Sequence, residues 1–96
     1  MTIKEFKIQY ALGSLTRCML LKLARDHNTD KEILTFLIKT DLKPVIKHWY
    51  YKYFAVKNSN TSKETLQWAL TYSRSELIRK HASAQLNKRG YYNKID

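Results

Sequence analysis

The chain has 96 residues, a length that suits one compact domain and not two. Hydrophobic residues make up 44%, which argues against disorder, while the low counts of Gly 2 and Pro 1 favour an all-α fold over hairpin-rich β structure. Lys+Arg 18 against Asp+Glu 8 gives a formal net charge of +10. This excess indicates an acidic partner, most commonly nucleic acid, although a basic surface can also serve solubility alone.

Cysteine usage and hydropathy indicate the compartment. Cys18 is the only cysteine, so no intramolecular disulfide can form and no thiolate metal or iron–sulfur cluster is expected. The longest unbroken apolar run, Met19 to Leu21, is far too short for a membrane span. The opening residues, "MTIKEFKIQY", lack the apolar core of a signal peptide. We therefore expect a soluble cytoplasmic protein with no membrane partner.

Helix-start signals recur along the chain. The capping-box pattern, Ser/Thr followed three residues later by Glu/Gln, occurs at Thr2–Glu5, Thr29–Glu32 and Thr61–Glu64, each time as Thr-x-Lys-Glu. A fourth box, "SRSE", covers Ser73–Glu76. In such a box the hydroxyl accepts from a first-turn amide, and the carboxylate reaches back to the amide of the N-cap residue. Each box predicts the beginning of a helix.

A second cap follows each threonine at the same spacing. Ser14, Asp41 and Ser73 lie twelve residues after Thr2, Thr29 and Thr61, and each precedes another apolar-periodic stretch. The pattern predicts three units of helix, tight turn and helix, in a single domain over 1–88 with a basic flexible tail over 89–96. The expected helices are 3–12, 15–25, 30–39, 42–56, 62–72 and 74–87, with Gly13 ending the first and Pro44 in the first turn of the fourth.

The second and third units match best, as "NTDKEIL" against "NTSKETL", at an offset of 32 residues. The stretches "LARDHNTDKEILTFLIKTD" and "AVKNSNTSKETLQWAL" resemble the variant leucine-rich repeat over about residues 23–80. The fit comes from positions Ala24, Asp26, Asn28, Thr29, Glu32, Leu34 and Leu37, and from Asn58, Asn60, Thr61, Glu64, Leu66 and Ala69.

The chain departs from that family where its repeat has two prolines, since His27 and Ser59 replace the first and Asp30 and Ser62 the second. The resemblance implies three stacked helix-turn-helix repeats in a short right-handed solenoid, similar to HEAT arrays. It implies no single activity. Some family members carry an iron–sulfur cluster on a separate cysteine cluster, and none is implied here with one cysteine.

The titratable residues have structural roles that leave none obviously free for catalysis. The four glutamates occupy the last position of the four capping boxes. The three histidines, His27, His48 and His81, show no metal-ligand spacing. Cys18 falls on the expected apolar face of its helix and is read as a core residue. We therefore predict no enzyme activity, no cofactor and no metal.

The stretch "KHWYYKYF" belongs to the expected fourth helix. At 100° per residue, Trp49, Tyr50 and Tyr53 share the apolar face, and Lys43, Lys47, Tyr51 and Phe54 gather on the opposite one. An exposed ring there could stack on unpaired bases. The alternative is that Tyr51 and Phe54 are buried by the five extra residues near the end of the second unit or by a second subunit.

Lys47 and Arg79 are equivalent by the 32-residue offset, so both point to the same side of the expected stack. We expect the second helices of the three units to present a basic surface that binds DNA or RNA mainly through phosphates. Its candidate residues are Arg17, Lys43, Lys47, Tyr51, Lys52, Arg74, Arg79, Lys80, Lys88 and Arg89. The alternative is an adaptor or inhibitor that docks an acidic protein. No helix carries a dense set of base-reading residues, which argues against sequence-specific reading of a duplex.

Overall fold

A computed structural model gives the fold and describes residues 1–40 and 50–91. Six α-helices and no strand occupy these residues, which confirms the expected all-α class for the described part of the chain. The helices are α1 (Ile3–Ala11), α2 (Arg17–Arg25), α3 (Lys31–Lys39), α4 (Tyr50–Lys57), α5 (Lys63–Tyr72) and α6 (Glu76–Lys88). All but α4 begin and end within two residues of the expected bounds, and part of the expected 42–56 helix lies outside the described residues.

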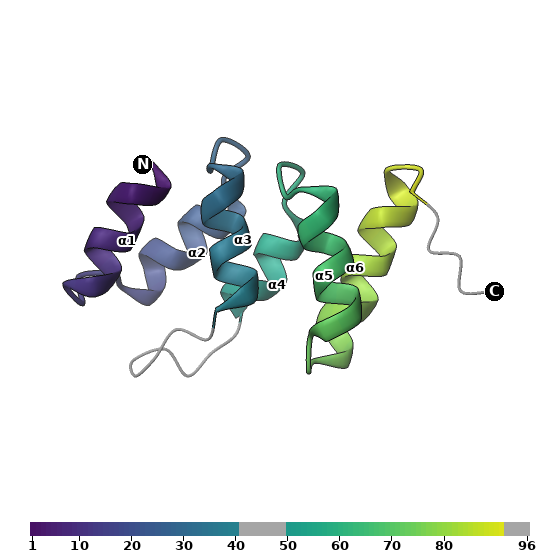
Figure 1. Cartoon of the computed structure of the whole chain (residues 1–96). Coiled ribbons are helices and arrows are strands. Elements are labelled where there is room, and N and C mark those ends of the chain that lie inside the picture. The colour runs from purple at the N-terminus through teal and green to yellow at the C-terminus, as the bar shows by residue number, and fades with distance from the viewer. Residues whose placement is uncertain (41–49, 92–96) are drawn as a thin grey trace.

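The helices lie in two rows. In one row α1 contacts α3 and α3 contacts α5, and in the other α2 contacts α4 and α4 contacts α6 (Figure 1). Contacts of α2 with α3, α3 with α4, and α5 with α6 join the rows. The molecule measures 45 × 24 × 17 Å along its principal axes. No helix in the described part of the chain has the length and apolar character that a membrane crossing needs.

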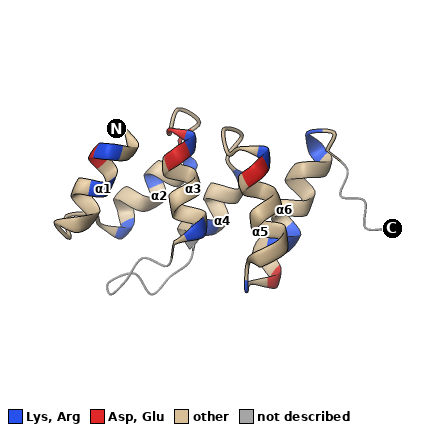
Figure 2. Cartoon of the chain, viewed as in Figure 1, with Lys and Arg blue, Asp and Glu red and all other residues tan. Residues whose placement is uncertain are grey.

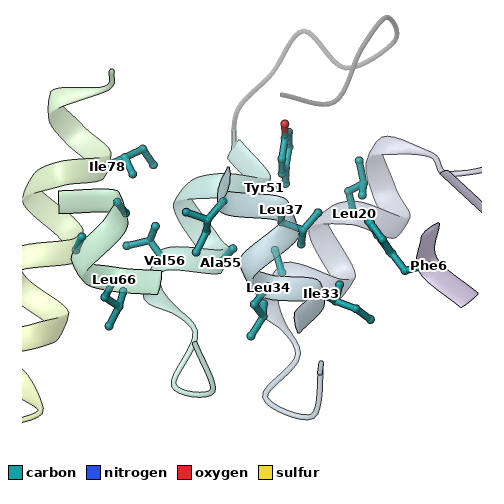
Figure 3. Packing of buried hydrophobic residues seen from close by; sticks show 14 of the residues in the cluster. Phe6, Leu20, Ile33, Leu34, Leu37, Tyr51, Ala55, Val56, Leu66 and Ile78 are labelled. Atoms are coloured by element: carbon teal, nitrogen blue, oxygen red, sulfur yellow. The ribbon is translucent and has the colours of Figure 1, made fainter. Parts of the chain in front are cut away.

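A continuous apolar core runs between the two rows (Figure 3). At one end Phe6 of α1 packs edge-on against Phe36 of α3, with ring centroids 5.4 Å apart. Leu34 and Leu37 of α3 are fully buried in the middle, and Leu66 of α5 extends the core toward α6. Full burial of a leucine contributes about 1.5–3 kcal/mol. The periodic apolar positions therefore explain why the helices associate.

The helix starts differ from the sequence prediction by one or two residues. The capping box of α1 is present as expected, since Glu5 N donates to Thr2 Oγ1 and Thr2 N donates to Glu5 Oε1. The expected caps of α2, α3, α5 and α6 are wrong, whereas Asp41, the expected cap of the fourth helix, lies outside the described residues. The observed N-cap residues are Thr16 for α2, Asp30 for α3, Ser62 for α5 and Ser75 for α6, in place of Ser14, Thr29, Thr61 and Ser73.

Thr29 and Thr61 are not N-cap residues, because their hydroxyls donate to backbone carbonyls of the preceding helix. Thr29 Oγ1 donates to Leu23 O, and Thr61 Oγ1 donates to Ala55 O, each at 2.5 Å and each spanning six residues. Both threonines are buried. The donors and the acceptors are each 32 residues apart, so the same loop closure occurs twice.

Asn58 holds the two loops together. Its side-chain amide donates to Ala24 O at 2.9 Å and to Asp26 O at 2.8 Å, while its Oδ1 accepts from Asn60 N. Asp26 makes the equivalent turn in the first loop, where its Oδ1 accepts from Asn28 N at 2.9 Å. These contacts fix the α4–α5 loop against the α2–α3 loop and give one edge of the molecule a defined shape.

Helix α4 presents a different face to the core than the sequence predicts. Tyr51 is only 3% exposed, and Ala55 and Val56 are fully buried with it. Tyr53 and Phe54 are half-buried. The reason is that α4 packs against α2, α3 and α6, and these contacts turn Tyr51 inward. Tyr51 is thus buried within the chain itself, and Trp49 lies outside the described residues.

Candidate nucleic-acid interface

Two of the predicted binding residues lie outside the described residues, and two others are not exposed. Lys43 and Lys47 lie outside the described residues, so their expected stripe has no structural account. Tyr51 is buried, so stacking on this ring was a wrong expectation. Lys52 is half-buried, and its ammonium donates to Ile38 O at 3.3 Å, the last buried residue of α3.

Two predicted arginines hold backbone carbonyls. The Arg79 guanidinium donates to Ser73 O at 2.6 Å across the α5–α6 turn. Arg89 reaches back to the α4–α5 loop, where it donates to Thr61 O and, at 3.0 Å each, to Asn58 O and Ser59 O. A neutral carbonyl does not cancel the charge of a guanidinium. Both arginines therefore add positive potential, but their geometry is already committed to the fold.

The remaining four predicted residues, Arg17, Arg74, Lys80 and Lys88, are exposed. Arg17 begins α2, while Lys80 and Lys88 belong to α6. Arg74 lies in the α5–α6 turn and lines a hollow with Trp68. Three of these four residues thus belong to the α2–α4–α6 row.

Charge is distributed unequally between the rows (Figure 2). Helices α1, α3 and α5 each carry a glutamate in the first turn, namely Glu5, Glu32 and Glu64. The described α2, α4 and α6 contain a single acid, Glu76. Leaving Lys52 aside, no lysine or arginine of the described residues lies within 4.0 Å of a carboxylate oxygen. The cations of this row other than Lys52 therefore have no carboxylate within ion-pair distance among the described residues.

A chain of ring and cation contacts crosses all three helices of this row. The Arg25 guanidinium of α2 lies 5.2 Å from the Phe54 ring of α4. Phe54 packs edge-on against Tyr53 at 5.4 Å, and Tyr53 packs edge-on against His81 of α6 at 4.6 Å. Lys57 Nζ lies 4.9 Å from the Tyr53 ring. We call these five residues, Arg25, Tyr53, Phe54, Lys57 and His81, the aromatic–basic band.

Of the band, only Phe54 is expected from the sequence, as a ring that could stack, although the sequence also carries a signal for its two cations. Arg25, Lys57 and Arg89 recur at the 32-residue offset and mark the end of α2, α4 and α6. A search for cations at the repeat spacing would have found them. The ring contacts could not be found this way, because they depend on how α4 is rotated between its neighbours.

One residue of the aromatic–basic band, His81, has a shifted pKa. Burial lowers the pKa of His81 below the ordinary histidine value, and the positive charges of Lys57 and Lys80 lower it further. The neutral imidazole is therefore favoured at neutral pH, and the cationic character of the band comes from Arg25 and Lys57.

Two other groups bear on the chemistry of this surface. Cys18 is exposed, not in the core as expected, because α2 turns Leu20 and Ala24 inward and leaves Cys18 on the face of Lys22. In the part of the chain that the structure describes, no three His, Cys, Asp or Glu residues are grouped closely enough to hold a metal ion.

Fold and surface together define an all-α protein with a cationic, ring-bearing face on one of two helix rows. Comparison with family models, curated proteins and solved structures found no match to this chain. The resemblance to the variant leucine-rich repeat stays a prediction.

Proposed function

We propose that this protein binds nucleic acid without catalysing a reaction, through the α2–α4–α6 row. The observation that supports this proposal is the aromatic–basic band, which joins two cations and three rings across three helices. Unneutralised cations suit phosphate contacts, and each neutralised phosphate releases counterions. Partly exposed rings suit unpaired bases, because every base has a face that can stack. Single-stranded DNA or RNA fits this combination best.

We also propose that the helix pairs are repeat units of a short right-handed solenoid, as the resemblance to the variant leucine-rich repeat implies. The recurring threonine bonds at Thr29 and Thr61 and the recurring turns at Asp26 and Asn58 support equivalence of the second and third units. In stacked repeats each unit contacts only its neighbours and corresponding side chains follow one surface. Arg25 and Lys57, which are 32 residues apart, would then occupy equivalent positions of neighbouring units on the proposed binding surface.

The test is a fluorescence-anisotropy titration with labelled single- and double-stranded oligonucleotides at low and moderate salt. The variant Arg25→Glu/Lys57→Glu should weaken binding about tenfold or more and flatten the salt dependence, by about 0.7 in the log–log slope for each phosphate of a single strand that is no longer neutralised. The matched control is Lys4→Glu/Lys7→Glu, which makes the same charge change on exposed positions of α1. It should lose much less affinity.

Equal losses in the two variants would show that net charge, and not the band, is responsible for binding. Absence of binding to any oligonucleotide at low salt would reject the proposal. An acidic protein would then be the leading partner, since the same unneutralised cations suit it.

A further inference from the structure

A second cationic feature lies on the loop edge, away from the band's ring contacts. A hollow of about 810 Å³ opens between the α2–α3 loop, the α4–α5 loop and the end of α6. Its lining carries five cations, Lys31, Lys57, Lys63, Lys88 and Arg89, against one carboxylate, Glu64. Figure 2 shows basic residues at the starts of α3 and α5 and at the end of α6, all on this edge. We call this feature the loop-edge hollow.

The polar groups beneath the lysines are already used to build the hollow. Ser62 Oγ accepts from Thr65 N as the cap of α5, and Asn60 Nδ2 donates to Thr29 O at 2.7 Å. His27 Nδ1 and Ser59 Oγ share a hydrogen bond of 3.1 Å between the two loops. Internal bonds therefore keep these loops in shape. Of the lining lysines, Lys57 already donates to Tyr53 Oη at 3.4 Å, and among the described residues no hydrogen bond involves the ammonium groups of Lys31, Lys63 and Lys88.

The charge of the lining selects the ligand. A single carboxylate would balance only one of the excess cations, whereas a phosphomonoester carries close to two negative charges and three acceptor oxygens. Lys31 and Lys63 begin α3 and α5, so the first-turn amides of both helices add positive potential from the same direction. Lys63 Nζ lies 4.4 Å from the Tyr91 ring, which leaves a partly exposed aromatic face beside the cations.

We propose that the loop-edge hollow binds a phosphomonoester, namely the terminal phosphate of the nucleic-acid strand that crosses the band. This inference rests on the proposed function and specifies which part of the strand is recognised. Lys57 links the two features, because it belongs to the band and also lines the hollow. A strand that lies along α2, α4 and α6 would thus meet the hollow at one end.

The test compares two oligonucleotides of the same sequence, one with a 5′-phosphate and one with a 5′-hydroxyl, and adds adenosine monophosphate as a free phosphomonoester. Wild type should bind the phosphorylated strand about fivefold or more tightly than the hydroxyl strand. The variant Lys31→Gln/Lys63→Gln should remove that preference and retain the affinity for the hydroxyl strand. Lys4→Gln/Lys7→Gln, with the same loss of charge, should keep the preference.

The two proposals fail in different ways. Binding of the hydroxyl strand reports on the band, and the gain from the phosphate reports on the hollow. If adenosine monophosphate binds, requires Lys31 and Lys63, and the strands show no difference, the phosphomonoester chemistry holds and its source is a free nucleotide. If no phosphomonoester binds, or if the preference survives in Lys31→Gln/Lys63→Gln, the inference is wrong.

Discussion

At the scale of single residues, the structure depends on polar side chains that hold buried carbonyls. Asn58 is 4% exposed and bonds three backbone groups, namely Ala24 O at the end of α2, Asp26 O in the α2–α3 loop and Asn60 N in its own loop. A buried carbonyl without a donor destabilises a protein, because its bond to water is lost and not replaced. The contact between the α2–α3 and α4–α5 loops therefore depends on the specific hydrogen bonds of Asn58.

The bonds of Asn58 give a prediction for Asn58→Ala. The change leaves Ala24 O and Asp26 O without the amide donor, so the free energy of unfolding should fall by about 2–3 kcal/mol. The matched control is Asn28→Ala, since Asn28 is exposed and only its backbone amide takes part in a hydrogen bond. Urea denaturation measures both variants. Similar losses for the two would contradict the role assigned to Asn58.

The residue types in the sequence indicated where the loops before α3 and α5 lie, but not whether each threonine hydroxyl donates or accepts a hydrogen bond. Thr29 and Thr61 have the right type and spacing for caps, yet each donates to a carbonyl of the preceding helix. A hydroxyl can donate or accept, and its sequence neighbours do not decide which. Asp30 and Ser62 stand one position later and are equally good caps. The choice follows from burial, which depends on the whole fold.

At the scale of helices, apolar periodicity located five of the six with little error. It did not give the rotation of α4, because Tyr and Phe occupy nearly every position from Tyr50 to Phe54 and any face appears apolar. Contacts with α2, α3 and α6 decide the rotation and bury Tyr51. The candidate site was missed for the same reason, since Tyr53 and Phe54 form the band only in this rotation.

The contact between α4 and α6 gives a prediction about pH. The pKa of His81 is lowered, so the unfolded chain takes up a proton near the ordinary histidine pKa of about 6.5 while the folded chain stays neutral to lower pH. The unfolded state then binds more protons, and stability falls as pH drops through that window. His81→Phe keeps a ring against Tyr53 and removes the titration. Its melting temperature should change less between about pH 7.5 and pH 5.

A second variant separates titration from packing. Lys57→Gln leaves the imidazole in place and removes one of the positive charges that lower its pKa. The folded and unfolded pKa values should then lie closer together, and the pH dependence of the melting temperature should again be smaller. A pH dependence that is unchanged in both variants would show that His81 has no part in it.

At the scale of the whole molecule, the formal net charge is +10. Among the described residues, and leaving Lys52 aside, no lysine or arginine forms an ion pair with a carboxylate, so the stability of the fold should depend on salt. Mutual repulsion of the lysines and arginines opposes folding, and added salt screens it. We therefore expect the melting temperature to rise by several degrees between about 20 mM and about 300 mM NaCl, since about 1 kcal/mol corresponds to about 4–8 °C for a domain of this size. Differential scanning fluorimetry measures this change.

The same salt has the opposite effect on the proposed binding, because counterion release favours the complex less as salt increases. Stability and affinity should thus move in opposite directions over one salt series, which excludes unfolding as the cause of weaker binding. Lys4→Glu/Lys7→Glu lowers the net charge on α1, far along the chain from the band, and should weaken the salt dependence of the melting temperature while it largely preserves affinity. If affinity and melting temperature instead fall together with salt, repulsion between the cations does not limit the stability of the fold, and this prediction is wrong.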